Sequence, residues 1–355
     1  MRSLVAANHT HAQSSEAMMN HSRRNFLAAA AAVAAAAPLT TSTAHAWEND
    51  TSCAELVRCF EDLPGDKSLK IFAPAVKGKE QILIESNASK MLFVASAIKT
   101  FVLCEALRQA DGPDVVSKIT QTPLALDDTV WSFGSPTFDP PNLTGVVSER
   151  TALEAMITRS DNTATDMMFK LAGAKKVRRF IASAGLKNTL VPDSTRALTA
   201  YVFGASNYLT ITWDQLNELV KSGKKPEHPF LNDVETLASS ADDFVSYYSR
   251  ALQGEFFKHG ETLDEFRRIL TLCEYIYLIP LPLGMSVYAK SGNADFPHFH
   301  VRSIAGGLYV DGRWAYFAFA INWYAADPDD PATVQAFFSI IHQTLTYVRD
   351  KLSRR

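Results

Sequence analysis

Segments typical of β-strands lie at both ends of this chain, and helical patterns fill the stretch between them. The strand candidates are residues 69–72, 81–85, 284–289, 299–310 and 313–323. The last two are rich in aromatic and β-branched residues, and the Asp311-Gly312 pair between them is a strong signal for a hairpin turn. Because both termini contribute strands, we expect one antiparallel sheet assembled from the two ends of the chain.

Helical spacing of apolar residues characterises the middle of the chain and both flanks of the strand candidates. The helix candidates are residues 52–62, 96–110, 150–171, 175–183, 213–221, 239–253 and 331–352. The first and the last adjoin strand candidates, and we expect them to flank the sheet. The others predict an inserted, all-helical lobe that faces the sheet.

Residues 1–46 have the pattern of a twin-arginine export signal. An arginine pair at 23–24 precedes an alanine-rich apolar stretch, and residues 44–46 fit the small-x-small pattern that a signal peptidase cuts. The stretch is shorter than the roughly 20 apolar residues of a membrane-spanning helix. We therefore expect an exported protein, periplasmic or secreted and without a membrane anchor, whose domain spans 47–355. Translation could begin at the first residue or at Met19.

The net charge argues against a nucleic-acid partner, and the spacing of the cysteines argues against a metal site built from them. The formal net charge is −3 at pH 7, which argues against a nucleic-acid partner. The cysteines are Cys53, Cys59, Cys104 and Cys273. Their spacing is not that of a metal site. A Cys53–Cys59 bridge is disfavoured, because positions six apart on one helix point to different sides, although an oxidising compartment permits it.

His298 and His300 alternate along a strand, but no third ligand is evident, so we expect neither metal nor cofactor.

Three short motifs that carry chemistry follow one another along the chain. They are Ser96-Ala97-Ile98-Lys99, Ser160-Asp161-Asn162 and Lys290-Ser291-Gly292. Ser96 stands at the start of a predicted helix, with Lys99 one turn further on the same face. The lysine can therefore take the proton of the serine, and the helix start favours the negative charge that develops as the serine attacks. Lys290 follows a strand-like run, which places the third motif at a sheet edge.

In order and context, these motifs resemble those of class A β-lactamases and their penicillin-binding relatives. The resemblance covers nearly all of the chain after the signal. The interval from Ser96 to Ser160 is close to that of the family, whereas the interval to Lys290 is longer. The resemblance implies an α+β fold of the β-lactamase/transpeptidase type, with a five-stranded antiparallel sheet flanked by the N- and C-terminal helices. Its sheet lobe would span about 47–93 and 284–355, and its inserted helical lobe about 94–283.

The resemblance also implies a role for each predicted site residue. The expected catalytic residues are Ser96, Lys99 and Ser160, and the expected substrate-binding residues are Asn162, Lys290, Ser291, Asn293 and Arg302. Ser96 would attack the lactam carbonyl with Lys99 as base, and Ser160 would pass a proton to the departing nitrogen, aided by the third motif. The backbone N–H groups of Ser96 and Asn293 would bind the oxyanion. Asn162 would hold the side-chain amide of the substrate, and Ser291 with Arg302 its carboxylate.

The sequence departs from the family at the residue that directs water onto the acyl-enzyme. Class A enzymes have a Glu-x-x-Leu-Asn segment in an omega-shaped loop, and the family interval leads here to Arg196, where the nearby carboxylate is Asp193. Asp193 is a candidate base, but we favour a structural role in which it caps the loop or pairs with Arg196. Trp131 either flanks the cleft or belongs to the core.

Acylation is therefore better supported than turnover, and three functions remain open. The first is a serine β-lactamase, the second a penicillin-binding D,D-peptidase or esterase, and the third a binding or sensing protein that is acylated and keeps the adduct. Each acts on a small molecule, and we expect a monomer.

Overall fold

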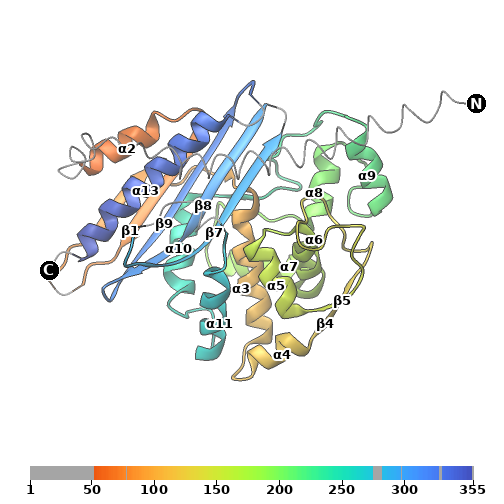
Figure 1. Cartoon of the computed structure of the whole chain (residues 1–355), viewed down its shortest axis with the longest axis horizontal. Helices are drawn as coiled ribbons and strands as arrows, with labels where there is room; N and C mark the ends of the chain where they lie inside the picture. The colour runs from red at the N-terminus through yellow and green to blue at the C-terminus, as the bar shows by residue number, and fades with distance from the viewer. Residues whose placement is uncertain (1–51, 77, 275–281, 297, 328–329, 354–355) are drawn as a thin grey trace, which may run out of the picture.

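The two ends of the chain form one sheet (Figure 1). This computed structural model describes residues 52–76, 78–274, 282–296, 298–327 and 330–353, so the expected signal lies outside the described residues. Strand order is β2-β1-β9-β8-β7, and every neighbouring pair is antiparallel. The strands are β1 (Asp66–Ala73), β2 (Ile82–Ser86), β7 (Ser286–Phe296), β8 (Phe299–Val310) and β9 (Arg313–Tyr324). The predicted five-stranded antiparallel sheet is confirmed, with β7 at one edge.

Strands β8 and β9 form the predicted hairpin. Asp311 and Gly312 both have positive φ, 47° and 81°, the conformation of a type I′ turn. Strand β7 corrects the prediction, which ended the strand at Ala289, because its pairing with β8 continues to Phe296. The small and polar residues of this extension lack strand propensity, but tertiary packing overrides that weak preference.

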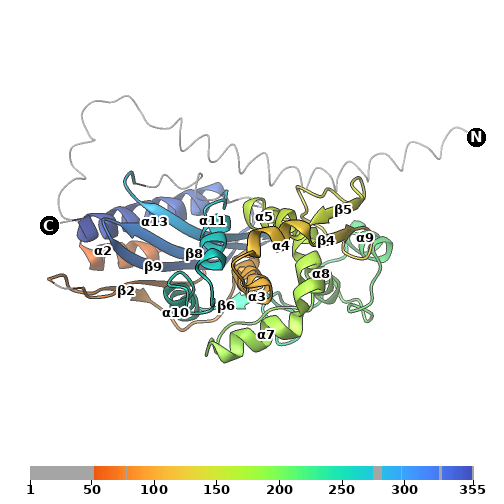
Figure 2. The ribbon, with the colours of Figure 1, turned by 90° about the horizontal axis from the view of Figure 1, so that it is seen from below.

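Helices α2 (Cys53–Glu61) and α13 (Pro331–Ser353) flank the sheet, as predicted, and pack against each other. The Ser52 side chain caps α2, and the ring of Phe60 meets that of Phe319 on β9 edge to face at 6.1 Å. Figure 2 shows α10 (Ala241–Ala251) on the other side of the sheet, where it packs against β1, β8 and β9. The sheet is therefore buried between helices on both faces.

The remaining helices form a lobe beside strand β7 (Figures 1 and 2). They are α3 (Lys99–Ala110), α4 (Val115–Gln121), α5 (Glu149–Thr158), α6 (Asn162–Met168), α7 (Ala174–Ser183), α8 (Thr195–Val202), α9 (Trp213–Lys221) and α11 (Gly260–Leu270). Residues 99–107 of α3 are all buried, so this helix forms the centre of the lobe. The single helix expected over 150–171 is instead two helices, because Ser160 adopts a positive φ of 56° and Asp161 caps a new helix.

Short strand pairs complete the lobe. Strand β3 (Leu92–Phe93) pairs with β6 (Ala238–Ser239), and β4 (Pro123–Leu126) pairs with β5 (Gly145–Ser148). Between β3 and α3 lies the 3-10 turn η1 (Ala95–Ile98), and the π-helical turn η2 (Phe169–Gly173) joins α6 to α7. Strand β3 therefore leads from the sheet lobe directly into the first of the three motifs, Ser96-Ala97-Ile98-Lys99.

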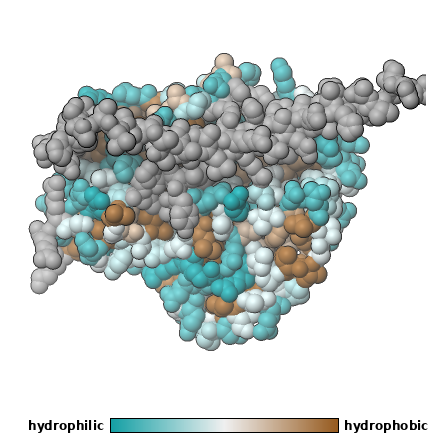
Figure 3. Space-filling model, viewed as in Figure 1, coloured by the Kyte–Doolittle hydropathy of each residue, from teal (hydrophilic) through white to brown (hydrophobic). Residues whose placement is uncertain are grey.

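Two further observations concern the cysteines and the surface. Cys53 and Cys59 are not bridged, and both are partly buried thiols. Among the described residues, no helix is both long and apolar enough to cross a bilayer. On the face shown in Figure 3, the visible described residues place hydrophobic side chains in small separate groups among hydrophilic ones.

Candidate active site

Ser96 lies on the 3-10 turn that opens α3. The preceding residue, Ala95, has a φ of 47°, a left-handed conformation that costs energy for a residue with a side chain. The Ser96 side chain is partly exposed, whereas Ala97 and Lys99 are buried. No hydrogen bond joins the Ser96 hydroxyl to any other described residue. This serine is therefore accessible at the start of a helix, and its hydroxyl is not held by another side chain of the described residues.

Contacts from the sheet hold the turn of Ser96 in place. The Asn322 side chain accepts a hydrogen bond from the Phe93 N–H at 3.1 Å and donates one to the Phe93 carbonyl at 2.8 Å. The Ser303 hydroxyl donates to the Val94 carbonyl at 2.7 Å. Strands β8 and β9 thus fix the backbone immediately ahead of the serine.

Gly292 brings the third motif against the same turn. A Cβ atom at this position would lie 2.1 Å from the Val94 carbonyl oxygen and 2.8 Å from the Ala97 nitrogen. Only glycine permits this approach without displacing the backbone. The glycine of Lys290-Ser291-Gly292 therefore sets how closely strand β7 approaches the start of α3.

Lys99 is fully buried and connects the first motif to the second. Its Nζ donates to the Ser160 carbonyl at 2.6 Å, to the Ser160 hydroxyl at 3.3 Å and to Asn162 Oδ1 at 2.7 Å. Burial and the nearby positive charge of Lys290 hold the pKa of Lys99 well below its ordinary value, against the opposing charges of two aspartates. The amine is therefore suited to accept a proton.

The second motif is presented at the break between α5 and α6. The φ of 56° at Ser160 turns this residue out of the helical path, and Asp161 anchors the break. The Asp161 carboxylate accepts hydrogen bonds from the backbone N–H groups of Ala164, Thr137 and Phe138 at 2.8 to 3.0 Å. This anchoring fixes the Ser160 hydroxyl beside the Lys99 amine.

Asn162 uses both ends of its side-chain amide within the protein. Besides accepting from Lys99, it donates from Nδ2 to the Phe133 carbonyl at 2.7 Å. Its predicted role was to hold the side-chain amide of a substrate. In this structure it holds the lysine in the site.

Lys290, Ser291 and Asn293 follow one another on the edge strand β7. Lys290 is 1% exposed, and burial lowers its pKa below the ordinary value. Ser291 is also buried, with its hydroxyl 3.7 Å from the thiol sulfur of Cys273. Asn293 is partly exposed and lies opposite Arg302 in the β7–β8 ladder. Strand β7 at the edge of the sheet thus places the buried amine of Lys290 near the buried amine of Lys99.

Arg302 is engaged by a carboxylate of the protein. Its guanidinium makes two hydrogen bonds to Asp295, at 2.9 and 3.0 Å, and its side chain is only 4% exposed. A substrate carboxylate would therefore meet an arginine that is already paired.

The segment that replaces the omega-loop glutamate is held by other residues. Asp193 pairs with Arg178 at 2.5 Å, and not with Arg196 as the sequence suggested. Asp166 on α6 accepts hydrogen bonds from the backbone N–H groups of Thr195 and Arg196 at 2.7 and 3.0 Å. Burial raises the pKa of Asp166 to about 6, although these hydrogen bonds act in the opposite direction. The carboxylates near this segment are thus committed to anchoring it.

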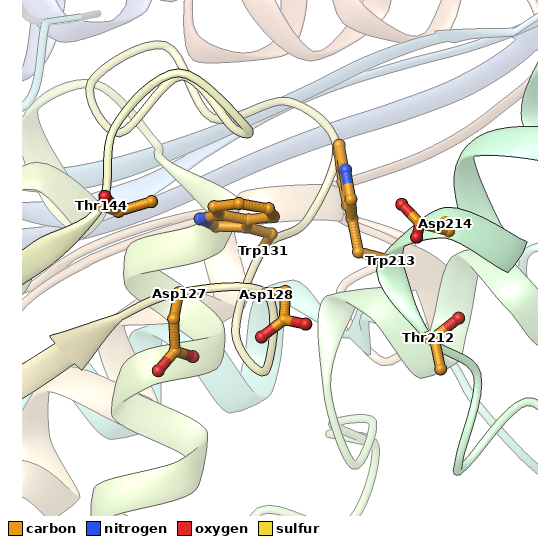
Figure 4. A pocket seen from close by; sticks show the side chains of 7 residues that line it. All are labelled: Asp127, Asp128, Trp131, Thr144, Thr212, Trp213 and Asp214. Carbon is orange, nitrogen blue, oxygen red and sulfur yellow. The ribbon is translucent and has the colours of Figure 1, made fainter.

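Trp131 lines a separate cavity of about 290 Å³ within the helical lobe (Figure 4). The cavity is lined by Asp127, Asp128, Trp131, Thr144, Thr212, Trp213 and Asp214. The Trp131 and Trp213 rings meet edge to face at 5.9 Å, and the Arg196 guanidinium donates to the Trp131 carbonyl. None of the predicted catalytic residues lines this cavity.

The two strand histidines do not converge. His300 is fully buried and lies 3.0 Å from Asp295, whereas His298 is exposed in a left-handed turn. Among the described residues, no group of three potential metal ligands is present.

Sequence reasoning missed three residues that organise the site. Asn322 holds the strand before Ser96, Asp166 anchors the start of α8, and Asp295 pairs with Arg302. Asp166 is one helical turn after the second motif, and that spacing was its only signal. The other two depend on strand register, which the sequence pattern left undefined.

Comparison with solved structures assigns the fold. The extended-spectrum β-lactamase TLA-3 is 15% identical, with a TM-score of 0.63 over 83% of this chain and 98% of that one. A class A β-lactamase from Bacteroides cellulosilyticus is 17% identical, with a TM-score of 0.60 over 83% and 96%. PBP-A gives the same identity and TM-score over 84% and 96%. No match was found among curated proteins.

The fold is therefore that of class A β-lactamases and of PBP-A. Residues 40–345 match the model of the Beta-lactamase enzyme family, which is most of the chain. The chain belongs to this family.

Proposed function

We propose that this chain is an exported hydrolase that opens β-lactams through an acyl-enzyme on Ser96. The observation that carries the proposal is the buried Lys99 amine, which has a lowered pKa and is held beside Ser160 one turn after an accessible serine. A neutral amine in this position is the base that a serine nucleophile needs.

The chemistry follows from these positions. As Ser96 Oγ bonds to the lactam carbonyl carbon, its proton moves to Lys99, and the backbone N–H groups of Ser96 and Asn293 stabilise the oxyanion. The carbon–nitrogen bond then breaks, and Ser160 delivers its proton to the nitrogen while it takes up the proton that Lys99 received from Ser96. Water cleaves the ester in a second step and restores the serine hydroxyl.

A second candidate is a penicillin-binding D,D-peptidase or esterase that hydrolyses a penicillin adduct slowly. Rapid hydrolysis of the adduct needs a group that directs water. The carboxylates of Asp193 and Asp166 favour the second candidate, because both are already held by contacts within the protein. One of the structural neighbours, a variant of PBP-A at 17% identity, was solved as an acyl-enzyme complex with penicillin G.

Pre-steady-state hydrolysis of a chromogenic cephalosporin, with Ser96→Ala as the control, tests the proposal. We expect a burst equal to the enzyme concentration, followed by sustained turnover that Ser96→Ala lacks. A burst without turnover favours the second candidate if D-alanyl peptides or esters are then hydrolysed. If those substrates are also untouched and the adduct persists in intact-mass spectra, the chain is a sensor. Absence of a burst contradicts the proposal.

We also propose that export follows the twin-arginine signal and that the processed protein is monomeric. N-terminal sequencing of the exported protein should begin at Trp47, and the double variant Arg23→Lys/Arg24→Lys should remain inside the cell. An unprocessed exported chain would contradict this reading.

A further inference from the structure

Arg302 and Asp295 form a closed ion pair at the edge of the sheet. Two parallel hydrogen bonds of 2.9 and 3.0 Å join the guanidinium to the two carboxylate oxygens, the strong bidentate geometry for such a pair. The side chains are only 4% and 9% exposed. The guanidinium also donates to the Val301 carbonyl at 2.8 Å and lies over the ring of Trp323 at 5.7 Å.

The pairing follows from strand register. Arg302 lies opposite Asn293, and Asp295 is two residues further along β7 on the same face, which makes the pair diagonal neighbours within reach of long side chains. His300, directly opposite Asp295, contacts the same carboxylate at 3.0 Å. Burial would raise the pKa of Asp295, but the His300 contact and the Arg302 charge lower it below its ordinary value. The carboxylate is therefore ionised and cancels the charge of the arginine.

An arginine that is already paired with a carboxylate of the protein discriminates poorly between charged and uncharged substrates. An incoming carboxylate would have to take Arg302 from Asp295, and the cost of separating this buried charge pair offsets what the new pair contributes. A neutral substrate group beside Arg302 leaves the pair with Asp295 intact and has no such cost. Asn293, expected to contribute to the oxyanion site, lies directly opposite this arginine. The paired arginine is therefore close to the place where the substrate would react.

We propose that Asp295 determines the substrate specificity of this site by withholding Arg302 from the substrate carboxylate. The inference rests on the proposed acylation of Ser96. It assigns to the site a substrate class that includes uncharged acyl donors, such as neutral esters and amides, beside carboxylate-bearing ones.

The experiment compares benzylpenicillin with its methyl ester, which differs in one carboxylate. The rate of Ser96 acylation by each is followed by intact mass, and their ratio is the readout. In Asp295→Asn, the freed Arg302 should raise the ratio in favour of the carboxylate by about tenfold, the factor that one charge-assisted hydrogen bond gives. An unchanged ratio in this variant, shown to be folded by circular dichroism, overturns the inference.

The double variant Asp295→Asn/Arg302→Gln keeps the test decisive if the single variant does not fold, because it removes both buried charges. Its ratio should equal that of the wild type within about twofold, since the pair contributes no net charge in either protein. A tenfold loss of preference for the carboxylate would show that Arg302 reads the substrate despite Asp295. Absence of any adduct on the wild type would contradict the proposed function itself, whereas adducts whose ratio is unchanged in Asp295→Asn contradict only this inference.

Discussion

At the scale of single residues, Lys99 lies in surroundings that suit a base better than a cation. It is fully buried, its hydrogen-bond partners are neutral oxygens of Ser160 and Asn162, and a second buried amine, Lys290, adds repulsion. Burial and the repulsion from Lys290 disfavour the protonated form relative to a lysine in water, and they outweigh the charges of Asp161 and Asp166. Ser96 and this amine are therefore the pair on which the proposed chemistry depends.

The lowered pKa of Lys99 predicts how acylation depends on pH. The neutral amine accepts the proton of Ser96, so the acylation rate should rise as pH increases through the pKa of Lys99, well below the ordinary lysine value. Stopped-flow acylation by benzylpenicillin across a pH series measures this. Lys99→Met should lower the rate by about 10² to 10⁴ at every pH. A wild-type rate that rises only near the ordinary pKa of lysine, 10.5, would contradict the assignment.

Asp166 and Asp193 allow a matched comparison of a buried and an exposed carboxylate near one segment. Asp166→Ala leaves the N–H groups of Thr195 and Arg196 unpaired, so the free energy of unfolding should fall by about 1–3 kcal/mol. Asp193→Ala removes an ion pair whose side chains are 41% and 38% exposed and should cost less than about 1 kcal/mol. Urea denaturation measures both. Equal losses would argue against Asp166 as the anchor.

At the scale of elements, the site depends on how closely strand β7 approaches the start of α3. Two hydrogen bonds between the Asn322 side chain and the Phe93 backbone and one from the Ser303 hydroxyl fix the backbone before Ser96, and Gly292 sets the distance to strand β7. The three motifs belong to different elements, so their chemistry requires this packing.

Gly292→Ala tests that packing. The added Cβ would meet the Val94 carbonyl at 2.1 Å, so strand or turn must shift, at a cost of about 1–3 kcal/mol in unfolding free energy. The extent of Ser96 acylation in Gly292→Ala, measured by intact mass, should also fall below that of the wild type. Gly260→Ala is the matched control, because no atom lies within 4 Å of its added Cβ and it opens a helix. Full acylation of Gly292→Ala would show that the close approach is not needed.

At the scale of the whole molecule, periodicity and turn signals in the sequence were enough for the architecture. The strands at both ends, the Asp311-Gly312 hairpin and the flanking terminal helices were all predicted. Within the site, helix geometry predicted Lys99 on the same face as Ser96, and the resemblance implied that Ser160 shares their site. The structure places the Lys99 amine 3.3 Å from the Ser160 hydroxyl.

The sequence could not predict contacts that depend on register between distant segments. Arg302 matched a substrate-binding position, but its pairing with Asp295 needs the alignment of β7 with β8. The extension of β7 through Gly292 was missed for a related reason, since small and polar residues there are held by packing and not by propensity. Of the two structural roles considered for Asp193, a cap of the loop or a pair with Arg196, the pair with Arg196 is not formed, because Asp193 pairs with Arg178 of α7.

The central claim is that a β-lactam bonds covalently to Ser96. The most direct measurement is peptide mapping by tandem mass spectrometry after brief exposure of the wild type and Ser96→Ala to benzylpenicillin. We predict one adduct with the mass of the whole antibiotic on the peptide that contains Ser96, and none on Ser96→Ala. An adduct on another residue, or an equal adduct on both proteins, would contradict the account.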